Sequence, residues 1–243
     1  MIKAQREKTF IKLFHLFNLR LLKKSFHTIK LTKASLHPDR IPPGAMVVIN
    51  HSSWWDPLIL FYINEVWLKT DGIAMMNEKG LKRFPFFRKL GAFSINTENR
   101  REILNSLRYT IEQMDQGCNI FIFPQGEETH LEKRPLQFRS GTAYLNGKRP
   151  ETPVISVTFY HHIRHHQLPE WFIHIGQPID LSGTHDKKEK TKRLEEIMTE
   201  QLDGLKNQVI HDDPEQFLTL LKGRSGVSES LEAMKQTLRR SIR

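Results

Sequence analysis

The chain has 243 residues, in which 37 Lys and Arg residues outnumber 27 Asp and Glu residues and give a formal net charge of +10. This length allows one large α/β domain with helical additions, and the charge predicts an anionic partner, either a phospholipid surface or a nucleic acid. The single cysteine, Cys118, excludes an internal disulfide framework and fits a reducing compartment. No run of roughly 18 apolar residues occurs, so the sequence predicts neither a membrane-spanning helix nor a signal peptide.

Residues 1 to 36 are predicted to form an amphipathic helical segment that associates with a membrane. Large apolar side chains recur at helical spacing within residues 8 to 30, with lysines and arginines between them. These apolar residues are Phe10, Leu13, Phe14, Phe17 and Leu21, and we expect the phenylalanines to insert among lipids. Because bulky apolar side chains accompany the charges, we favour a membrane over nucleic acid. Packing of the helix against the domain stays open as the alternative.

Residues 37 to 184 alternate apolar runs with helical segments. Strands are expected at 46–49, 72–76, 92–95, 119–123, 154–160 and 171–175, and helices at 58–68, 98–116 and from 138 onward. Pro85 interrupts a basic and aromatic segment at 79–90. This alternation predicts an α/β fold with a mostly parallel sheet flanked by helices, and a functional site at the carboxyl ends of the strands.

Residues 185 to 243 are predicted to be a helical C-terminal extension. The segment is highly charged and shows a helical period through its first half. Further helices are expected at 214–222 and 227–242, joined by a turn that contains Gly223 and Gly226. No strand is expected in this region.

The apolar run from Met46 to Ile49 ends in a polar connection that contains His51 and Asp56. Pro57 suits the first turn of a helix, so the connection joins a strand to a helix. A histidine accepts a proton near neutral pH, and a carboxylate on its other ring nitrogen fixes the tautomer and stabilises the imidazolium. The pair is a candidate for a catalytic base and its orienting residue, and a solvated turn histidine is the alternative.

Taken in chain order, four blocks of the sequence resemble the phospholipid/glycerol acyltransferase family. His51 and Asp56 match its His-x4-Asp motif, and residues 121–126 match its Phe-Pro-Glu-Gly block; residues 91–95 and 153–157 are similar to two further blocks. The resemblance implies transfer of an acyl chain from a thioester, acyl-CoA or acyl carrier protein, to the hydroxyl of a lysolipid. It implies that His51 takes the hydroxyl proton while Asp56 holds His51, without a serine or cysteine nucleophile and without a cofactor.

The blocks that the resemblance associates with the acceptor depart from the family pattern. The implied acceptor-binding residues are Thr97, Arg100, Gln125, Gly126, Glu127, Glu128 and Arg139. Gln125 stands in place of the family glutamate, and Glu128 and Thr97 stand where the family has arginines that are associated with the acceptor phosphate. A carboxylate pair disfavours a phosphate unless Arg100, Arg101 or Arg139 reaches the headgroup. A neutral acceptor such as a glycolipid is therefore an alternative to a lysophospholipid.

Other functions compete with acyl transfer. The chain can be a non-catalytic, lipid-binding member of the same fold, although His51 and Asp56 argue against this. Nucleic-acid binding lacks any supporting sequence motif. Residues 161–166 contain four histidines, but no cysteine or carboxylate set accompanies them, so we predict no metal site. The preferred prediction is an enzyme bound peripherally to the cytoplasmic side of a membrane.

Overall fold

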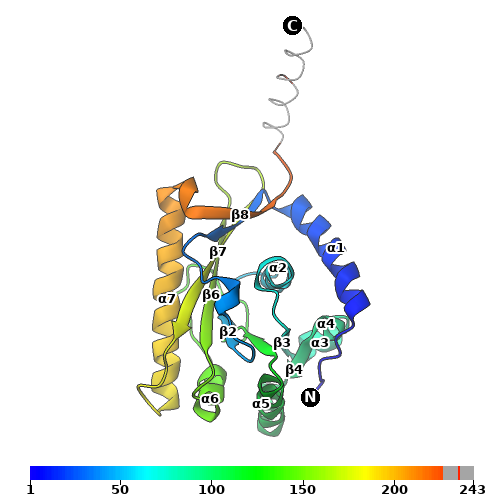
Figure 1. The fold of residues 1–243 in the computed structure, drawn as a ribbon, viewed down its shortest axis with the longest axis vertical. Coiled ribbons are helices and arrows are strands. Elements are labelled where there is room, and N and C mark those ends of the chain that lie inside the picture. The colour runs from blue at the N-terminus through cyan, green and yellow to red at the C-terminus, as the bar shows by residue number, and fades with distance from the viewer. Residues whose placement is uncertain (227–234, 236–243) are drawn as a thin grey trace.

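An eight-stranded sheet runs through the molecule, with helices on both of its faces (Figure 1). The structure is a computed structural model that describes residues 1–226 and residue 235. The strands are β1 (Thr28–Thr32), β2 (Met46–Ile49), β3 (Gly72–Asn77), β4 (Ala92–Ile95), β5 (Asn119–Ile122), β6 (Val154–His162), β7 (Glu170–Ile179) and β8 (Phe217–Lys222). The helices are α1 (Lys8–Ser25), α2 (Asp56–Ile63), α3 (Glu78–Arg83), α4 (Phe87–Leu90), α5 (Arg100–Asp115), α6 (Gly141–Lys148) and α7 (Lys187–His211).

The strand order is β4-β3-β5-β2-β6-β7-β1-β8, and neighbours pair in parallel except at β6–β7 and β1–β8. Strand β2 lies between β5 and β6 and is buried on both faces. Met46 and Val48 face one core, whereas Val47 and Ile49 face the other, as the period of a strand requires. The predicted α/β class with a mostly parallel sheet is confirmed.

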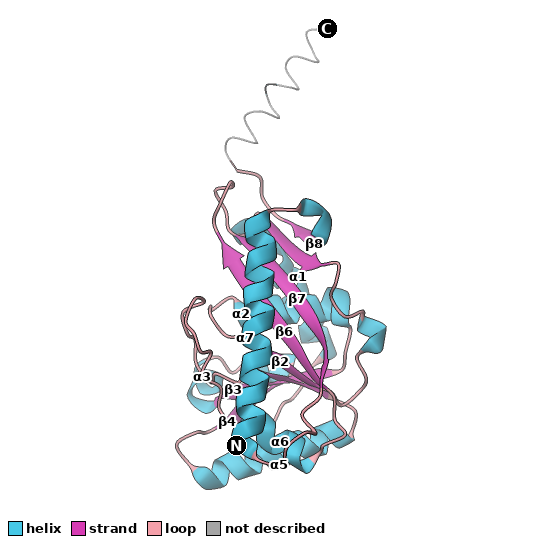
Figure 2. Cartoon of the chain, turned by 90° about the vertical axis from the view of Figure 1, so that its left-hand side faces the viewer, coloured by secondary structure: helices cyan, strands magenta, loops and turns pink. Residues whose placement is uncertain are grey.

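The helices divide between the two faces of the sheet. Helices α1 and α2 contribute to the core that contains Val47 and Ile49, and α5, α6 and α7 contribute to the core that contains Met46 and Val48. Figure 1 shows α1 and α7 on opposite sides of the sheet, and Figure 2 shows α7 lying along β6 and β7. This arrangement leaves the carboxyl ends of β2, β3, β4 and β5 together at one edge of the parallel part of the sheet.

The prediction of a continuous helix through residues 8–30 is wrong at its end. Helix α1 ends at Ser25, and residues 28–32 form β1, which pairs with β7 and β8. Ile29 and Leu31 are buried in the core on the α2 side. Because alternating β-branched and apolar residues fill an inner position of the sheet, tertiary pairing determines their conformation.

The prediction that the C-terminal extension contains no strand is also wrong. Residues 187–211 form α7 as a helix, but the segment predicted as helical at 214–222 consists of a 3₁₀ turn followed by β8. Strand β8 pairs antiparallel with β1 and covers its open edge. The helix predicted at 227–242 lies outside the described residues.

Helix α1 has one face against the domain and one face in solvent. Phe14 is buried against Phe61 of α2 and Phe86, and Asn18 donates its side-chain amide to the carbonyl of Leu58 at 2.9 Å. The sequence therefore predicted the wrong role for Phe14, which packs on the domain instead of facing outward. No helix in the described part of the chain is long and apolar enough to cross a membrane.

Candidate active site

His51 lies two residues beyond the end of β2, at the carboxyl end of a strand in the middle of the sheet. The loop that contains it leads into α2, whose first residues are Asp56 and Pro57. Strand β5 is the parallel neighbour of β2, and the segment that follows it contains Gln125. Because β2 and β5 are parallel, their carboxyl ends lie side by side, and the two loops that follow these strands meet there.

Asp56 holds the side chain of His51 by its Nδ1 atom. Its Oδ2 atom lies 2.7 Å from Nδ1 and accepts the main-chain N–H groups of Ser52 at 2.6 Å and Ser53 at 2.9 Å. Asp56 is completely buried. Since an ionised carboxylate only accepts hydrogen bonds, the proton of a neutral His51 ring resides on Nδ1 and leaves Nε2 as an acceptor.

The surroundings of the His51 ring limit its motion and leave Nε2 available. The ring lies against Phe123, with centroids 4.6 Å apart. Asn50 exchanges two hydrogen bonds with the main chain of Phe159, at 2.7 and 3.0 Å, and so ties the end of β2 to β6. Within residues 1–226, no hydrogen bond reaches Nε2 of His51. This is the geometry of a general base that waits for a proton.

Gln125, Gly126 and Arg139 come together beside His51. Gln125 is buried, and its Oε1 accepts the main-chain N–H of His51 at 2.5 Å. Arg139 is exposed and donates Nε to the carbonyl of Gln125 at 3.3 Å, so that a Cβ atom at Gly126 would lie 2.6 Å from this Nε. Gly126 also has a φ of +77°, which favours glycine. Glu127 and Glu128 follow in the same loop and are exposed.

Thr97 and Arg100 lie at a different part of this edge. They follow β4, which is separated from β2 by β3 and β5. Three strand spacings correspond to about 14 Å. The ends of β4 and β2 are thus separated along the sheet, whereas Arg139 lies over Gly126 in the segment after β5, and acceptor binding by Thr97 and Arg100 stays a prediction.

His161 is a second histidine near the catalytic loop. It lies in the last part of β6, its ring stacks on Trp171 with centroids 4.4 Å apart, and its Nε2 lies 3.5 Å from Oγ of Ser52. Burial lowers the pKa of His161, the Asp56 carboxylate opposes this shift, and the neighbouring His162 adds to it. A neutral His161 therefore adds no positive charge beside His51.

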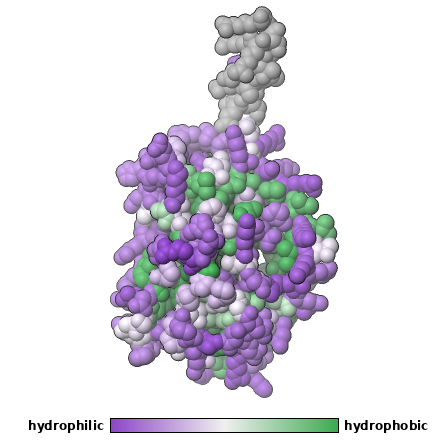
Figure 3. Space-filling view, in the orientation of Figure 1, coloured by the Kyte–Doolittle hydropathy of each residue, from purple (hydrophilic) through white to green (hydrophobic). Residues whose placement is uncertain are grey.

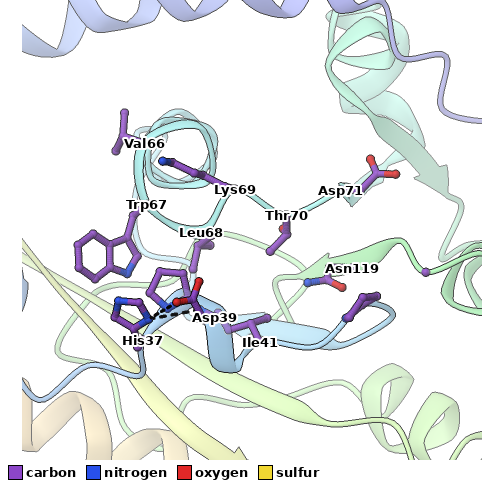
Figure 4. Close-up of a pocket in the computed structure, with 13 residues that line it drawn as sticks. His37, Asp39, Ile41, Val66, Trp67, Leu68, Lys69, Thr70, Asp71 and Asn119 are labelled. Atoms are coloured by element: carbon purple, nitrogen blue, oxygen red, sulfur yellow. Dashed lines mark hydrogen bonds and ion pairs between the residues drawn. The ribbon is translucent and has the colours of Figure 1, made fainter.

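A cavity of about 590 Å³ lies at the amino ends of the parallel strands, at the opposite end of the strands from His51 (Figure 4). Its lining includes Trp67, Asp71 before β3, and Asn119 at the start of β5. Figure 4 shows His37 and Asp39 paired at its rim. The cavity is separated from His51 by the length of a four-residue strand, roughly 13 Å, and is not the site of His51 chemistry.

The described residues contain no cluster of three His, Cys, Asp or Glu side chains that suits a metal ion. His161 and His162 belong to β6, and residues 163–169 form the connection to β7. The histidine-rich segment is thus mainly part of the sheet and its connection.

Sequence reasoning missed three residues around His51: Phe123 against the ring, Thr129 at the main chain, and His161 near Ser52. Phe123 was visible as the end of an apolar strand. Thr129 had no signal, because its contact to His51 is mainly through backbone atoms that any residue type carries. His161 lies in the histidine cluster at residues 161–166, where nothing in the sequence indicates a contact with Ser52.

Comparison with known proteins places the chain among acyltransferases. The family described as Acyltransferase matches residues 33–160, which is more than half of the chain. A probable 1-acyl-sn-glycerol-3-phosphate acyltransferase of Mycoplasma pneumoniae is 25% identical over 186 residues, covering 74% of this chain and 60% of that protein. The chain thus matches less than two thirds of that relative's length.

A solved structure has a similar fold. The crystal structure of the 1-acyl-sn-glycerophosphate (LPA) acyltransferase PlsC from Thermotoga maritima superposes with a TM-score of 0.59 at 20% identity, and covers 83% of this chain and 84% of the other. At this identity the likeness shows the fold alone. The family match extends over the His51 loop and the segment after β5, and the protein belongs to the acyltransferase family.

Proposed function

We propose that the protein transfers a fatty acyl chain from a thioester donor to the hydroxyl of a membrane lipid, with His51 as general base. The observation that carries the proposal is the bond of Nδ1 to a buried carboxylate, with Nε2 left without a partner within residues 1–226. Two main-chain N–H groups fix the same carboxylate oxygen, so the base has one orientation and one tautomer.

The reaction needs one proton carrier. Nε2 of His51 takes the proton of the acceptor hydroxyl as its oxygen attacks the thioester carbonyl. The tetrahedral intermediate then collapses, the carbon–sulfur bond breaks, and the thiolate takes the proton from His51. Asp56 stabilises the imidazolium that exists between these two events. The acyl chain passes directly from sulfur to oxygen, so the route contains no acyl-enzyme.

The relatives support a lysophospholipid or glycerolipid as the acceptor. The Mycoplasma pneumoniae protein and the Thermotoga maritima structure are both named for 1-acyl-glycerol-3-phosphate. In this chain, the guanidinium of Arg139 lies over Gly126, after the end of β5. A phosphate that reaches His51 through a glycerol would meet Arg139 and not Arg100.

The carboxylates of the same loop favour a second candidate, a neutral lipid alcohol. Glu127 and Glu128 are exposed in the segment that contains Gly126, so two negative charges accompany one positive charge there. Like charges disfavour a phosphate, and carboxylates accept hydrogen bonds from the hydroxyls of a sugar headgroup. The preference between these acceptors depends on whether Arg139 or the glutamates contact the headgroup.

Charge-reversal variants separate the two acceptors. If the glutamates set the preference, the wild-type enzyme uses a monoacyl glycolipid better than lysophosphatidate, and Glu128→Arg shifts the ratio toward lysophosphatidate. If Arg139 binds the phosphate, Arg139→Ala loses activity on lysophosphatidate selectively. Glu151→Arg makes the same charge change in an exposed turn before β6, at the other edge of the sheet, and leaves the acceptor ratio unchanged.

The outer face of α1 supports attachment to the membrane. Leu13, Leu16 and Phe17 are 62%, 51% and 57% exposed, and apolar side chains gather on the side of the molecule where α1 lies (Figure 3). Trp54, in the catalytic loop, is also exposed, and the next residue, Trp55, contacts Phe26 just beyond α1. Tryptophan and other apolar side chains that have basic residues beside them favour a bilayer interface. We propose that these residues hold the His51 loop at the lipid surface.

The direct test is to incubate the purified enzyme with labelled acyl-CoA and a total lipid extract, and to identify the lipid that becomes labelled. A labelled diacyl phospholipid or acylated glycolipid formed by the wild-type enzyme, and absent with His51→Ala, is the expected result. Label transfer by His51→Ala at the wild-type rate would contradict the proposal. A parallel reaction with acyl carrier protein as donor distinguishes the two thioesters.

A further inference from the structure

Both main-chain polar groups of His51 are bound by one segment, residues 125–129. The N–H of His51 donates to Oε1 of Gln125 at 2.5 Å. The carbonyl of His51 accepts the N–H of Thr129 at 3.0 Å and the hydroxyl of Thr129 at 3.4 Å. The segment that follows β5 therefore holds His51 on both sides of its Cα atom.

A hydrogen bond between the two side chains closes this arrangement. Nε2 of Gln125 donates to Oγ1 of Thr129. The direction of each bond is determined, because the N–H of His51 needs an acceptor and so faces Oε1, which leaves the amide N–H₂ toward Thr129. The threonine hydroxyl then has its own proton for the carbonyl of His51. The N–H of His51, one N–H of the Gln125 amide and the hydroxyl of Thr129 thus each have an acceptor.

Gln125 is in no position to act as an ordinary acceptor-binding residue. It is only 4% exposed, and both ends of its amide are occupied within the protein. We propose that Gln125 and Thr129 are positioning residues that clamp the main chain of His51 for proton transfer, and that an amide at position 125 keeps negative charge away from the base. The proposal rests on the proposed role of His51 as that base.

The charges near His51 make the second part of the proposal testable. Asp56 is bonded to the ring, and His161 lies beyond Ser52 on the β6 side. On the β5 side, Glu127 and Glu128 are exposed and Arg139 lies over Gly126. A carboxylate at position 125 would be a second buried negative charge beside His51, and would favour the protonated ring, which is inactive as a base. It would also attract the Thr129 hydroxyl away from the carbonyl of His51.

Variants of Thr129 test the clamp. Thr129→Val keeps the side-chain shape and removes the hydroxyl, so we expect kcat to fall about tenfold or more with KM unchanged, because small displacements of a base are costly. Thr129→Ser restores the hydroxyl and should recover most of the activity. Thr110→Val is the matched control, since its buried hydroxyl donates to the carbonyl of Ser106 within α5, away from His51. Wild-type kcat in Thr129→Val would overturn the clamp.

Gln125→Glu tests the charge. We expect the acidic limb of the pH profile of kcat/KM to move up by about one pH unit, which a purely structural role would not cause. An acidic limb at the wild-type pH would overturn the second part of the proposal. If Thr129→Val fails to fold, Thr129→Ala, which also removes the hydroxyl, tests the clamp, and wild-type kcat in this variant would overturn it. If His51→Ala remains active, the proposed function itself fails. If only the Thr129 and Gln125 variants behave as wild type, the clamp fails and the base assignment stands.

Discussion

Asp56→Asn removes the charge of the orienting residue while its shape stays the same. The Oδ2 atom accepts from Nδ1 of His51 and from the main chains of Ser52 and Ser53, whereas the buried Oδ1 atom has no hydrogen-bond partner within the described residues. An asparagine must place its oxygen at the Oδ2 position, because its N–H₂ group would otherwise face two main-chain donors. The structure thus predicts that His51 keeps its tautomer in this variant.

The expected loss of rate follows from the lost charge. Two unit charges about 4 Å apart attract by about 4 kcal/mol at an effective dielectric near 20, and this attraction is present only after His51 takes the proton. A change of about 4 kcal/mol in the barrier corresponds to about 10³-fold in kcat. A flipped tautomer would cost about 10⁴-fold, as in a serine protease triad. The N–H₂ group at the unpartnered Oδ1 position also costs stability, about 1–3 kcal/mol.

The assay is the single-turnover rate of acyl transfer with saturating acceptor, together with the melting temperature of the variant. We expect the rate to fall by about 10³-fold with substrate affinity unchanged. Asp39→Asn is the control, because Asp39 also pairs with a histidine, His37 at 3.2 Å, but at the other edge of the sheet. A loss of less than tenfold in a folded Asp56→Asn enzyme would refute the stabilisation of the imidazolium by Asp56.

Three further predictions concern the membrane, the chemical route and acid stability. Replacing Leu13, Leu16 and Phe17 together by serine should release the protein from anionic vesicles in a sedimentation assay, and unchanged sedimentation would show that the exposed face of α1 is not the anchor. Incubation with donor alone should leave the intact mass unchanged, since a stoichiometric adduct on Ser52 would indicate a two-step route. Burial lowers the pKa of His174, so on acidification the unfolded chain binds a proton at His174 before the folded protein does, and stability should fall as the pH decreases below about 6.5. His174→Gln should reduce the slope of melting temperature against pH, and an unchanged slope would show that His174 is not the cause of the acid sensitivity.

The parts of the fold with strong local patterns could be predicted from the sequence. Strand β2 is a continuous apolar run because both of its faces are buried, and α5 has a helical apolar face. The strands β1 and β8 could not be predicted in the same way. Residues 28–32 come directly after an amphipathic helix, and no turn residue separates them from it. Strand β8 is rich in leucine and forms a strand because it pairs with the open edge of β1.

The candidate site was predictable where a motif encodes it and not where the topology does. His51 and Asp56 are five positions apart, so local geometry alone brings their side chains together. The distance from His51 to Arg100 depends on the strand order, in which β3 and β5 separate β4 from β2. The contact of Thr129 with the main chain of His51 depends on how two loops meet, and it leaves no pattern in the sequence.

The steady-state rate of His51→Ala tests the role of His51 as the base most directly. With labelled acyl-CoA and the acceptor that the wild-type enzyme uses, kcat should fall by about 10²–10⁴-fold, the usual contribution of a general base. The melting temperature of His51→Ala should stay close to that of the wild type, because the ring is partly exposed at the end of β2. A folded His51→Ala enzyme that keeps the wild-type kcat would contradict the role of His51 as the general base.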